Sequence, residues 1–160
     1  MFTMLDSLCR ISELCGLKVD DVNVEERTLR VTGKGDKQRS IPIGQRTAGL
    51  IARYVAKYRP RTGAANLFLT RSGRAMTKNK VEKIMRAHGK QAGIKGVRVS
   101  PHTLRHTGSV MFVRNGGGAF SLQRILGHTS LEMTRTYCNL ADTDVREAHR
   151  RSSPGDRLEL

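Results

Sequence analysis

The segment LGHTSLEMTRTYCNL, residues 126–140, carries a histidine and a tyrosine at a spacing that suits chemistry on a phosphate. Tyr137 is one of three tyrosines in a chain that has no tryptophan. His128 precedes it by nine positions, which is about 12 to 14 Å along a helix. Because helical side chains lean toward the N-terminus of their helix, the phenol is predicted to point back toward His128. The alternative is that Tyr137 packs in the core with Met133 and Cys138.

His102 and Arg105 are predicted to share one face in the first turn of a helix. Ser100 is the expected N-cap of that helix, and Pro101 its first residue. The N–H groups at such a helix start are unpaired and attract anions, and a phosphate fits them well. A capping turn with two surface cations is an equal alternative.

Arg10 stands in a predicted helix among Leu8, Cys9 and Ile11, so we expect its side chain to be partly buried. A partly buried arginine needs an acceptor. Glu13, one turn further along, is one candidate, and a bound phosphate is the other.

Lys34 is predicted at the tip of a β-hairpin, on the side opposite Leu29 and Val31. Gly33 and Gly35 flank it and would let the backbone approach a ligand closely. The stretch GKGDK lacks the spacing of a nucleotide-binding P-loop. Basic hairpin tips are usually only solvated, and that reading stays open.

Together these residues form an inventory for attack on a phosphodiester: two arginines, two histidines and a lysine, with one tyrosine hydroxyl as the candidate nucleophile. The sequence has no cluster of carboxylates that would bind Mg²⁺. We therefore expect phosphoryl transfer without a metal, in which guanidinium groups stabilise the charge of the transition state.

The elements that must position these residues are mostly helices. Two apolar stripes mark a helix through Leu50 to Tyr58, which places Tyr54 and Tyr58 toward the core, and one through Val81 to Ala92. A capping box of Thr129 with Glu132 is predicted to open the helix of Tyr137. The remaining expected elements are helices over residues 4–17, 101–114, 121–126 and 142–151, a hairpin over 28–43 that turns at 35–36, and a short strand at 22–24. The predicted fold class is α+β, mainly α-helical with a small three-stranded antiparallel sheet.

Length and charge agree with one nucleic-acid-binding domain. The 160 residues suffice for a single core, and a formal charge of +15 with a pI near 10.7 suggests a polyanionic partner. A solvated basic surface is the alternative. No segment is long and apolar enough to span a membrane, and no signal peptide is recognisable, so we expect a cytoplasmic protein. Cys9, Cys15 and Cys138 do not have the spacing of zinc ligands and are expected to be reduced.

The order and the amino-acid sequences of these motifs resemble those of the tyrosine recombinases, the family of phage integrases and Xer-like chromosome-dimer-resolving recombinases. RISELCGL resembles their first arginine box, VTGKGDKQRSIPI their lysine hairpin, HTLRHT their histidine–arginine box, and LGHTSLEMTRTYCNL their histidine-to-tyrosine segment. The resemblance runs from about residue 4 to 150. In this family the residues before the first arginine are usually a small residue and a leucine, where this chain has Leu8 and Cys9.

The resemblance implies that Tyr137 attacks the scissile phosphate, forms a 3′-phosphotyrosyl bond and releases a 5′-hydroxyl. Arg10 and Arg105 would hold the non-bridging oxygens, with His128 assisting through a hydrogen bond. Lys34 would protonate the leaving oxygen, and His102 would act as acid or base for the tyrosine hydroxyl. Glu13 would brace the site as a carboxylate, and His106 would support it. The hairpin residues Lys34, Lys37 and Arg39 would bind DNA. Neither a metal, ATP nor any other cofactor is expected.

By the same resemblance, residues 1–150 form a catalytic domain and 151–160 a tail, while the first helices of that domain and an upstream DNA-binding domain are missing. The chain is then a fragment or a naturally short form. We expect double-stranded DNA as partner and a tetramer on two duplexes in a bacterial, archaeal or phage-host cell. The segment DTDVREAHRR, residues 142–151, is the candidate for docking on a neighbouring subunit. Two alternatives stay open: a non-catalytic DNA-binding module that regulates a full-length recombinase, and relaxation of supercoils in the manner of a type IB topoisomerase.

Overall fold

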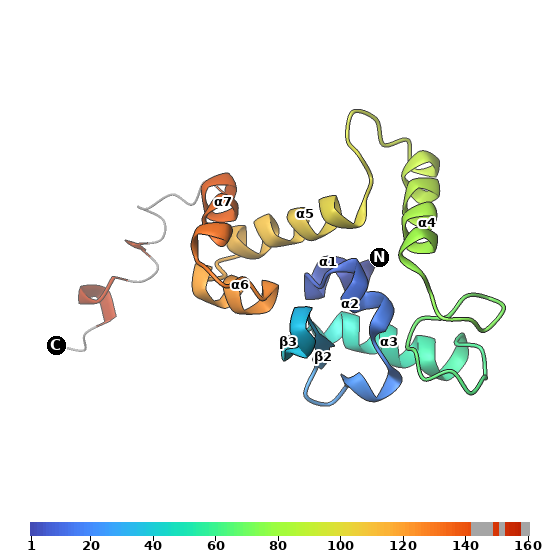
Figure 1. The fold of residues 1–160 in the computed structure, drawn as a ribbon. Helices are drawn as coiled ribbons and strands as arrows, with labels where there is room; N and C mark the ends of the chain where they lie inside the picture. Colours follow the sequence, from blue (N-terminus) through green and yellow to red (C-terminus); the bar gives the residue numbers. More distant parts are fainter. Residues whose placement is uncertain (142–148, 151–152, 158–160) are drawn as a thin grey trace.

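A computed structural model describes residues 1–141, 149–150 and 153–157. It is mostly helical, with one small antiparallel sheet that lies at one side of the helices in Figure 1, which confirms the predicted fold class. The elements are α1 (Phe2–Ser7), α2 (Ile11–Gly16), β1 (Val22–Asn23), β2 (Thr28–Thr32), β3 (Gln38–Pro42), α3 (Gln45–Lys57), α4 (Lys78–Gln91), α5 (Pro101–Arg114), α6 (Ala119–Leu126) and α7 (Glu132–Ala141). Among the described residues, no helix is long and apolar enough to cross a membrane.

The helix predicted over residues 4–17 is wrong as a single element, because the chain breaks it between α1 and α2. Leu8 ends α1 with a φ of 55°, a left-handed conformation that costs an L-residue about 1–2 kcal/mol. Arg10 then adopts an extended backbone (φ −70°, ψ 152°) as the N-cap of α2. Apolar spacing continues across the break, because Leu8 is still buried. Periodicity alone therefore could not reveal it.

The predicted hairpin and its extra strand are confirmed, with β2 at the centre of the order β1-β2-β3. In this register Leu29 pairs with Ile41, and Val31 pairs with Arg39. These four residues face the interior, so an arginine occupies an inward position next to apolar side chains. The tip turns through Gly35 and Asp36, both with positive φ, which glycine and aspartate tolerate better than most residues.

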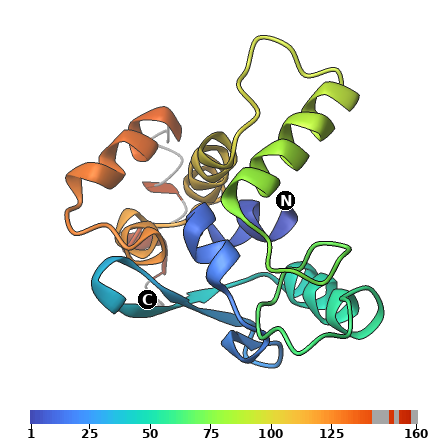
Figure 2. The ribbon, with the colours of Figure 1, turned by 45° about the vertical axis from the view of Figure 1, so that its right-hand side comes forward.

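Two hydrophobic clusters hold the fold together. The first cluster joins the sheet to α1, α2 and α3, and its buried members are Met4, Cys9, Leu14, Leu17, Leu29, Val31, Ile41, Ile43, Ala48, Ile51 and Leu67. The second cluster joins α5, α6 and α7 through Leu8, Val113, Leu122, Leu126, Tyr137 and Ala141. Helix α1 contacts both α3 and α5, and α6 contacts β3. Figure 2 shows the α5–α7 group beside the sheet, so the two clusters adjoin.

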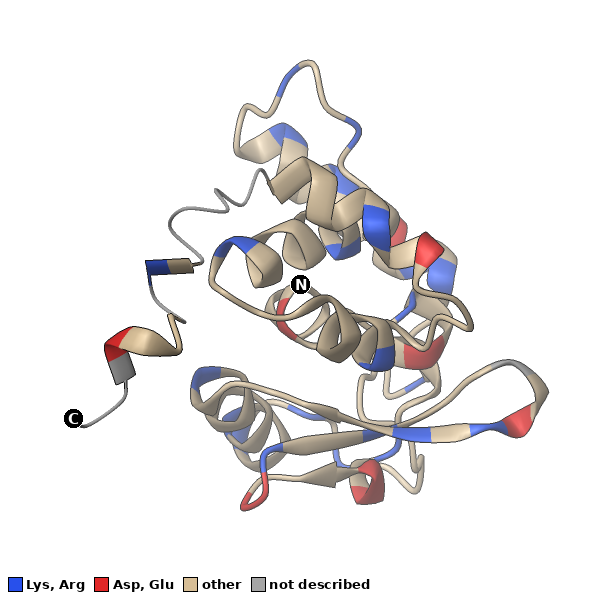
Figure 3. Cartoon of the chain, turned by 90° about the vertical axis from the view of Figure 1, so that its left-hand side faces the viewer, with Lys and Arg blue, Asp and Glu red and all other residues tan. Residues whose placement is uncertain are grey.

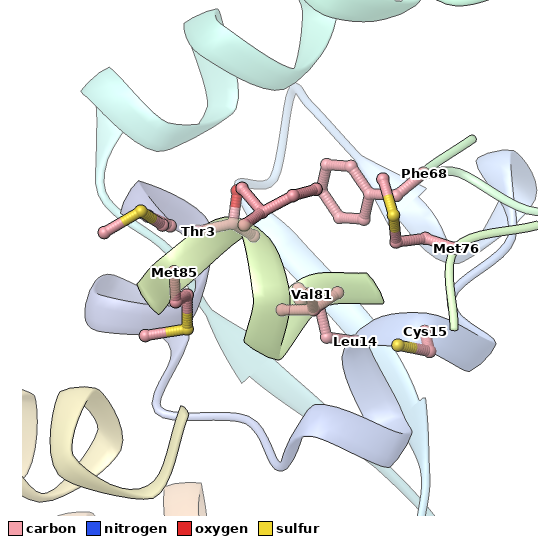
Figure 4. Close-up of a pocket in the computed structure, with 9 residues that line it drawn as sticks. Thr3, Leu14, Cys15, Phe68, Met76, Val81 and Met85 are labelled. Atoms are coloured by element: carbon pink, nitrogen blue, oxygen red, sulfur yellow. The ribbon is translucent and has the colours of Figure 1, made fainter. Parts of the chain in front are cut away.

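Helix α4 packs on α2 at the other side of the first cluster. Between them lies an apolar pocket of about 140 Å³, shown in Figure 4, whose lining includes Leu14, Cys15, Phe68 and Val81. The predicted helix through residues 81–92 is thus confirmed as α4, which ends at Gln91. The pocket contains none of the residues proposed for chemistry.

Three smaller predictions differ from the structure. Tyr58 is the C-cap of α3 and is 62% exposed, so its core assignment is wrong. Tyr54 is partly buried, and its hydroxyl accepts a hydrogen bond from the Leu69 amide at 3.1 Å. Helix α7 begins at Glu132, which makes Glu132 the first helical residue instead of the third. The capping box of Thr129 with Glu132 is therefore not formed as predicted.

Candidate active site

Tyr137 lies on α7 and is both packed and placed among histidines. Only 9% of its surface is exposed, and it belongs to the second cluster. Its ring meets the His106 ring edge-on at 5.2 Å between centroids and stacks on the His128 ring at 6.4 Å. The two alternatives from the sequence, core packing and a position beside His128, are thus both realised.

His128 is held between the end of α6 and α7. Gly127 ends α6 in the left-handed conformation (φ 65°), which favours glycine. The Nδ1 atom of His128 then lies 3.2 Å from the hydroxyl of Thr134, which is fully buried on α7. Burial lowers the pKa of His128, and the positive charges of Arg105, Arg10 and Arg39 lower it further. The imidazole is therefore neutral at pH 7.

Arg105 comes from α5, and its guanidinium reaches the junction of several elements. It donates one hydrogen bond to the Leu8 carbonyl and another, of 3.0 Å, to the Leu126 carbonyl. The left-handed turn at Leu8 contributes the first acceptor, and the C-terminus of α6, where carbonyls are unpaired, contributes the second. Burial lowers the pKa of Arg105, and the neighbouring charge of Arg10 adds to this effect. A buried cation is thus fixed close to a second one.

The predicted anion site at the start of α5 takes a different form. Ser100 caps the helix as expected and accepts a hydrogen bond from the Thr103 amide at 3.2 Å. His102 is exposed in the first turn, whereas Arg105 is buried. The two side chains therefore lie in different environments, one in solvent and one in the interior. The residues of α5 that lie near Tyr137 are Arg105 and His106.

Arg10 and Glu13 form the local pair that the sequence left as one alternative. The Arg10 amide and guanidinium donate to the two Glu13 oxygens at 2.8 and 3.1 Å. The Arg10 side chain stays 41% exposed, while that of Glu13 is 2% exposed. Burial alone would raise the pKa of Glu13, but hydrogen bonds from Arg39 and Arg10 outweigh it and keep the pKa below its ordinary value. The carboxylate is therefore charged, and Arg10 still presents N–H groups outward.

Arg39, predicted to bind DNA, points inward instead of outward. Its guanidinium makes a two-point ion pair with Glu13, at 2.8 and 3.1 Å. Its Nε donates to the Ile125 carbonyl at 3.0 Å. Only 18% of the side chain is exposed. The sequence does contain a signal for this, because Arg39 lies two residues before Ile41 and therefore faces the same, inward side of β3.

The hairpin tip reaches the same site. The backbone of Lys34 opens the short turn Lys34–Asp36, while its side chain lies outside the part of the structure that is described. Lys37 is exposed beside this turn, and Lys and Arg residues lie along the hairpin as well as on the helices (Figure 3). Lys37 is thus free to contact a polyanion in the way predicted for it.

A cleft of about 920 Å³ runs between the hairpin and the link that leads into α7. Its lining comes from α2, both arms of the hairpin and the start of α7, and includes Arg10, Glu13, Thr32, Gly33, Lys37, Arg39, Gly127, Thr129 and Met133. Within the described residues, no group of three or more His, Cys, Asp or Glu side chains is arranged to hold a metal ion. Arg105 places a positive charge next to Tyr137, and a guanidinium group suits phosphate oxygens.

Comparison with known proteins finds relatives along almost the whole chain. The family model described as "Phage integrase family" matches residues 1–144. Tyrosine recombinase XerC of Pelobacter propionicus is 35% identical over 156 residues, which are 97% of this chain and 51% of that protein. The crystal structure of XerA recombinase has a TM-score of 0.80 and 33% identity, and the match covers 95% of this chain and 56% of that one.

A third match is to a structure that contains DNA. The Tn1549 transposon integrase in complex with a circular intermediate DNA has a TM-score of 0.74 and 25% identity, with 94% of this chain and 56% of that chain covered. The chain thus spans about half the length of the relatives it matches.

Proposed function

The chain belongs to the phage integrase family, and from that premise and the geometry around Tyr137 we propose that it cleaves and rejoins DNA strands in site-specific recombination or integration. The observation that carries the proposal is the position of Tyr137, with its ring against His106 and His128 and with the buried Arg105 close by. A tyrosine has an ordinary pKa near 10, so it needs adjacent cations and a base to attack a phosphate at neutral pH. Residues 1–150 are proposed as the catalytic unit, with 151–160 as its tail.

In the proposed reaction the Tyr137 oxygen attacks phosphorus and its proton passes to a base. The family resemblance assigns this role to His102, with support from His106, whose ring contacts that of Tyr137. The bond from phosphorus to the 5′-oxygen breaks, and Lys34 protonates that oxygen as it leaves. Arg10 and Arg105 bind the non-bridging oxygens, and His128 donates a further hydrogen bond. The Leu8 and Leu126 carbonyls occupy only two of the guanidinium donors of Arg105. The other donors remain for phosphate.

Rejoining is the reverse reaction with another strand. The 5′-hydroxyl of the partner strand attacks the phosphotyrosine, restores a phosphodiester and releases the phenol. One phosphodiester is exchanged for another through a covalent ester, so the proposed cycle needs neither ATP nor a metal. Fixed guanidinium groups supply the charge stabilisation.

Double-stranded DNA is the proposed partner, supported by the charge of +15. Its affinity should fall steeply with salt, because lysine and arginine contacts to phosphates release counterions. Two finer points remain proposals: a tetramer on two duplexes, and docking of residues 142–151 on a neighbouring subunit. That segment lies outside the described residues except for His149 and Arg150.

The test is covalent capture of DNA. The protein is incubated with a pool of short duplexes of randomised sequence, each carrying one nick that lets the cleaved end diffuse away. We expect a protein–DNA adduct that survives a denaturing gel, and none with Tyr137→Phe, which keeps the ring and removes the nucleophile. An adduct of undiminished yield in Tyr137→Phe would exclude Tyr137 as the nucleophile.

The same assay separates the alternatives. Salt-sensitive DNA binding without an adduct on any duplex favours a binding module that does not cut. If an adduct forms, two marked duplexes distinguish strand exchange, which yields recombinant products, from relaxation of supercoils, which reseals the original strand.

A further inference from the structure

Arg39 stands where three parts of the candidate site meet, and the reaction proposed above gives it no role. It comes from β3, pairs with Glu13 on α2 and donates to the Ile125 carbonyl at the end of α6. These partners lie 26 and 86 positions away in sequence. One side chain thus joins the hairpin, the segment of Arg10 and the segment of His128.

The contact with Glu13 connects Arg39 to Arg10. Both Glu13 oxygens are shared, because each accepts from Arg39 and from either the amide or the guanidinium of Arg10. Glu13 is 5% exposed. A buried carboxylate that is bonded from two sides is held in one orientation. The direction in which Arg10 leaves the start of α2 therefore depends on Arg39.

The contact with α6 connects Arg39 to His128. Besides the bond to Ile125, Nη2 of Arg39 lies 3.5 Å from the Leu126 carbonyl, the acceptor that also binds Arg105. The guanidinium lies flat against Gly127, where an added Cβ would stand 3.0 Å from its central carbon. His128 follows directly. A cation at the C-terminus of a helix is also favoured by the helix dipole.

We propose that Arg39 is a positioning residue that sets Arg10, the hairpin and His128 in register for attack by Tyr137, and that it does not bind DNA. The inference rests on the proposed function, since it concerns the geometry of that reaction. A planar guanidinium can hold a carboxylate with two parallel bonds while its Nε reaches a third acceptor, whereas a lysine ammonium cannot. A lysine at this position would keep the positive charge but lack the planar set of donors, and it should therefore not position the site as Arg39 does.

The first test separates DNA affinity from the cleavage rate. In Arg39→Lys and Arg39→Gln, the dissociation constant for duplex DNA should stay within about twofold, because few phosphates can reach an inward side chain. The single-turnover cleavage rate at saturating DNA should fall about tenfold to a hundredfold, since small displacements of reacting groups have effects of this size. Weakened binding with an unchanged rate at saturation would overturn the inference and restore the DNA-contact role.

Arg30 gives a matched control. It lies on the neighbouring strand, faces outward and also makes an ion pair, with Asp21 at 3.1 Å. Arg30→Gln should leave the cleavage rate at saturating DNA unchanged. The double variant Glu13→Gln with Arg39→Gln removes both buried charges and should regain melting temperature over Arg39→Gln without regaining the cleavage rate. Recovery of both together would mean that Arg39 contributes only to stability.

The second test needs no cleavage. The guanidinium of Arg39 lies against Gly127, next to His128, so Arg39→Gln should shift the NMR signals of the Gly127 amide and the His128 ring in the free protein, and Arg30→Gln should leave them unchanged. Unaltered signals in folded Arg39→Gln overturn the positioning role, whether or not the wild-type protein forms an adduct. A wild-type protein that forms no adduct contradicts the proposed function separately.

Discussion

The two hydrophobic clusters differ in what they enclose. The first cluster, around the sheet, buries aliphatic and sulfur-containing side chains. The second cluster, formed by α5–α7 and Leu8, buries Tyr137 itself, with His106 and His128 against its ring. Arg39 links the two, because it leaves the sheet and ends at α6. If the proposed function holds, packing in the second cluster also orients the reacting groups, whereas packing in the first cluster supports the fold.

Arg105→Lys should have the largest effect on the cleavage rate, because it removes the buried guanidinium group that α5 contributes. A lysine cannot bond the Leu8 and Leu126 carbonyls and still offer a planar pair of donors to phosphate. Cleavage in a single-turnover assay should fall about 10²- to 10³-fold, as when one donor to a transition-state oxyanion is lost.

Arg114→Lys is the matched control on the same helix, where the arginine is exposed and its Nη2 lies 3.5 Å from the Leu140 carbonyl. Its cleavage rate should equal that of the wild type. If Arg105→Lys also cleaved within about threefold of the wild type, then α5 would contribute no transition-state contact through Arg105.

A pair of leucine variants tests the comparison between the clusters itself. Leu29 and Leu122 are both fully buried, one in each cluster. Each change to alanine should lower the free energy of unfolding by about 2–5 kcal/mol, measured by denaturant titration. At a temperature where both variants are folded, Leu122→Ala should cleave more slowly than wild type, whereas Leu29→Ala should retain its rate. Equal cleavage rates in the two variants would show that packing in the second cluster matters no more for cleavage than packing in the first.

Glu13→Gln should have the smallest effect, and one that depends on pH. The pKa of Glu13 is below its ordinary value of 4.5 in the folded protein, so its charge stabilises the fold above that value. This contribution is lost as the pH falls through 4.5 toward the folded pKa. At pH 7 the variant should be about 1.5–3 kcal/mol less stable, the range for hydrogen bonds to charged groups.

Denaturant titrations from pH 7 to pH 3 measure this change. The gap in unfolding free energy between wild type and Glu13→Gln should narrow as the pH falls. A gap that stays constant over this range would show that the carboxylate charge does not contribute to stability.

The sequence was sufficient for most of the fold, because the hairpin, the capped start of α5 and the glycine that ends α6 each have a local signal. The break at Leu8 has none, since a buried leucine in the left-handed region is imposed by packing and by the bond from Arg105 to its carbonyl. The sequence indicates this break only through Leu8 itself, which stands where the family usually has a small residue.

For the candidate site, spacing predicted that Tyr137 and His128 would meet, because both lie on one short stretch of chain. It could not predict the contact of Tyr137 with His106, which joins two helices. Arg39 is another case: it was predicted to bind DNA as part of the hairpin, although its parity with Ile41 places it on the inward face of the strand. Buried ion pairs across long sequence separations have no local signature.

The measurement that tests the central claim most directly is the identity of the residue bonded to DNA. The adduct from nicked duplex is digested with protease and nuclease, and the modified peptide is sequenced by mass spectrometry. The chain offers three tyrosines, Tyr54, Tyr58 and Tyr137, of which Tyr137 alone should carry the nucleotide. A nucleotide on Tyr54, on Tyr58 or on a residue of another type would contradict the account.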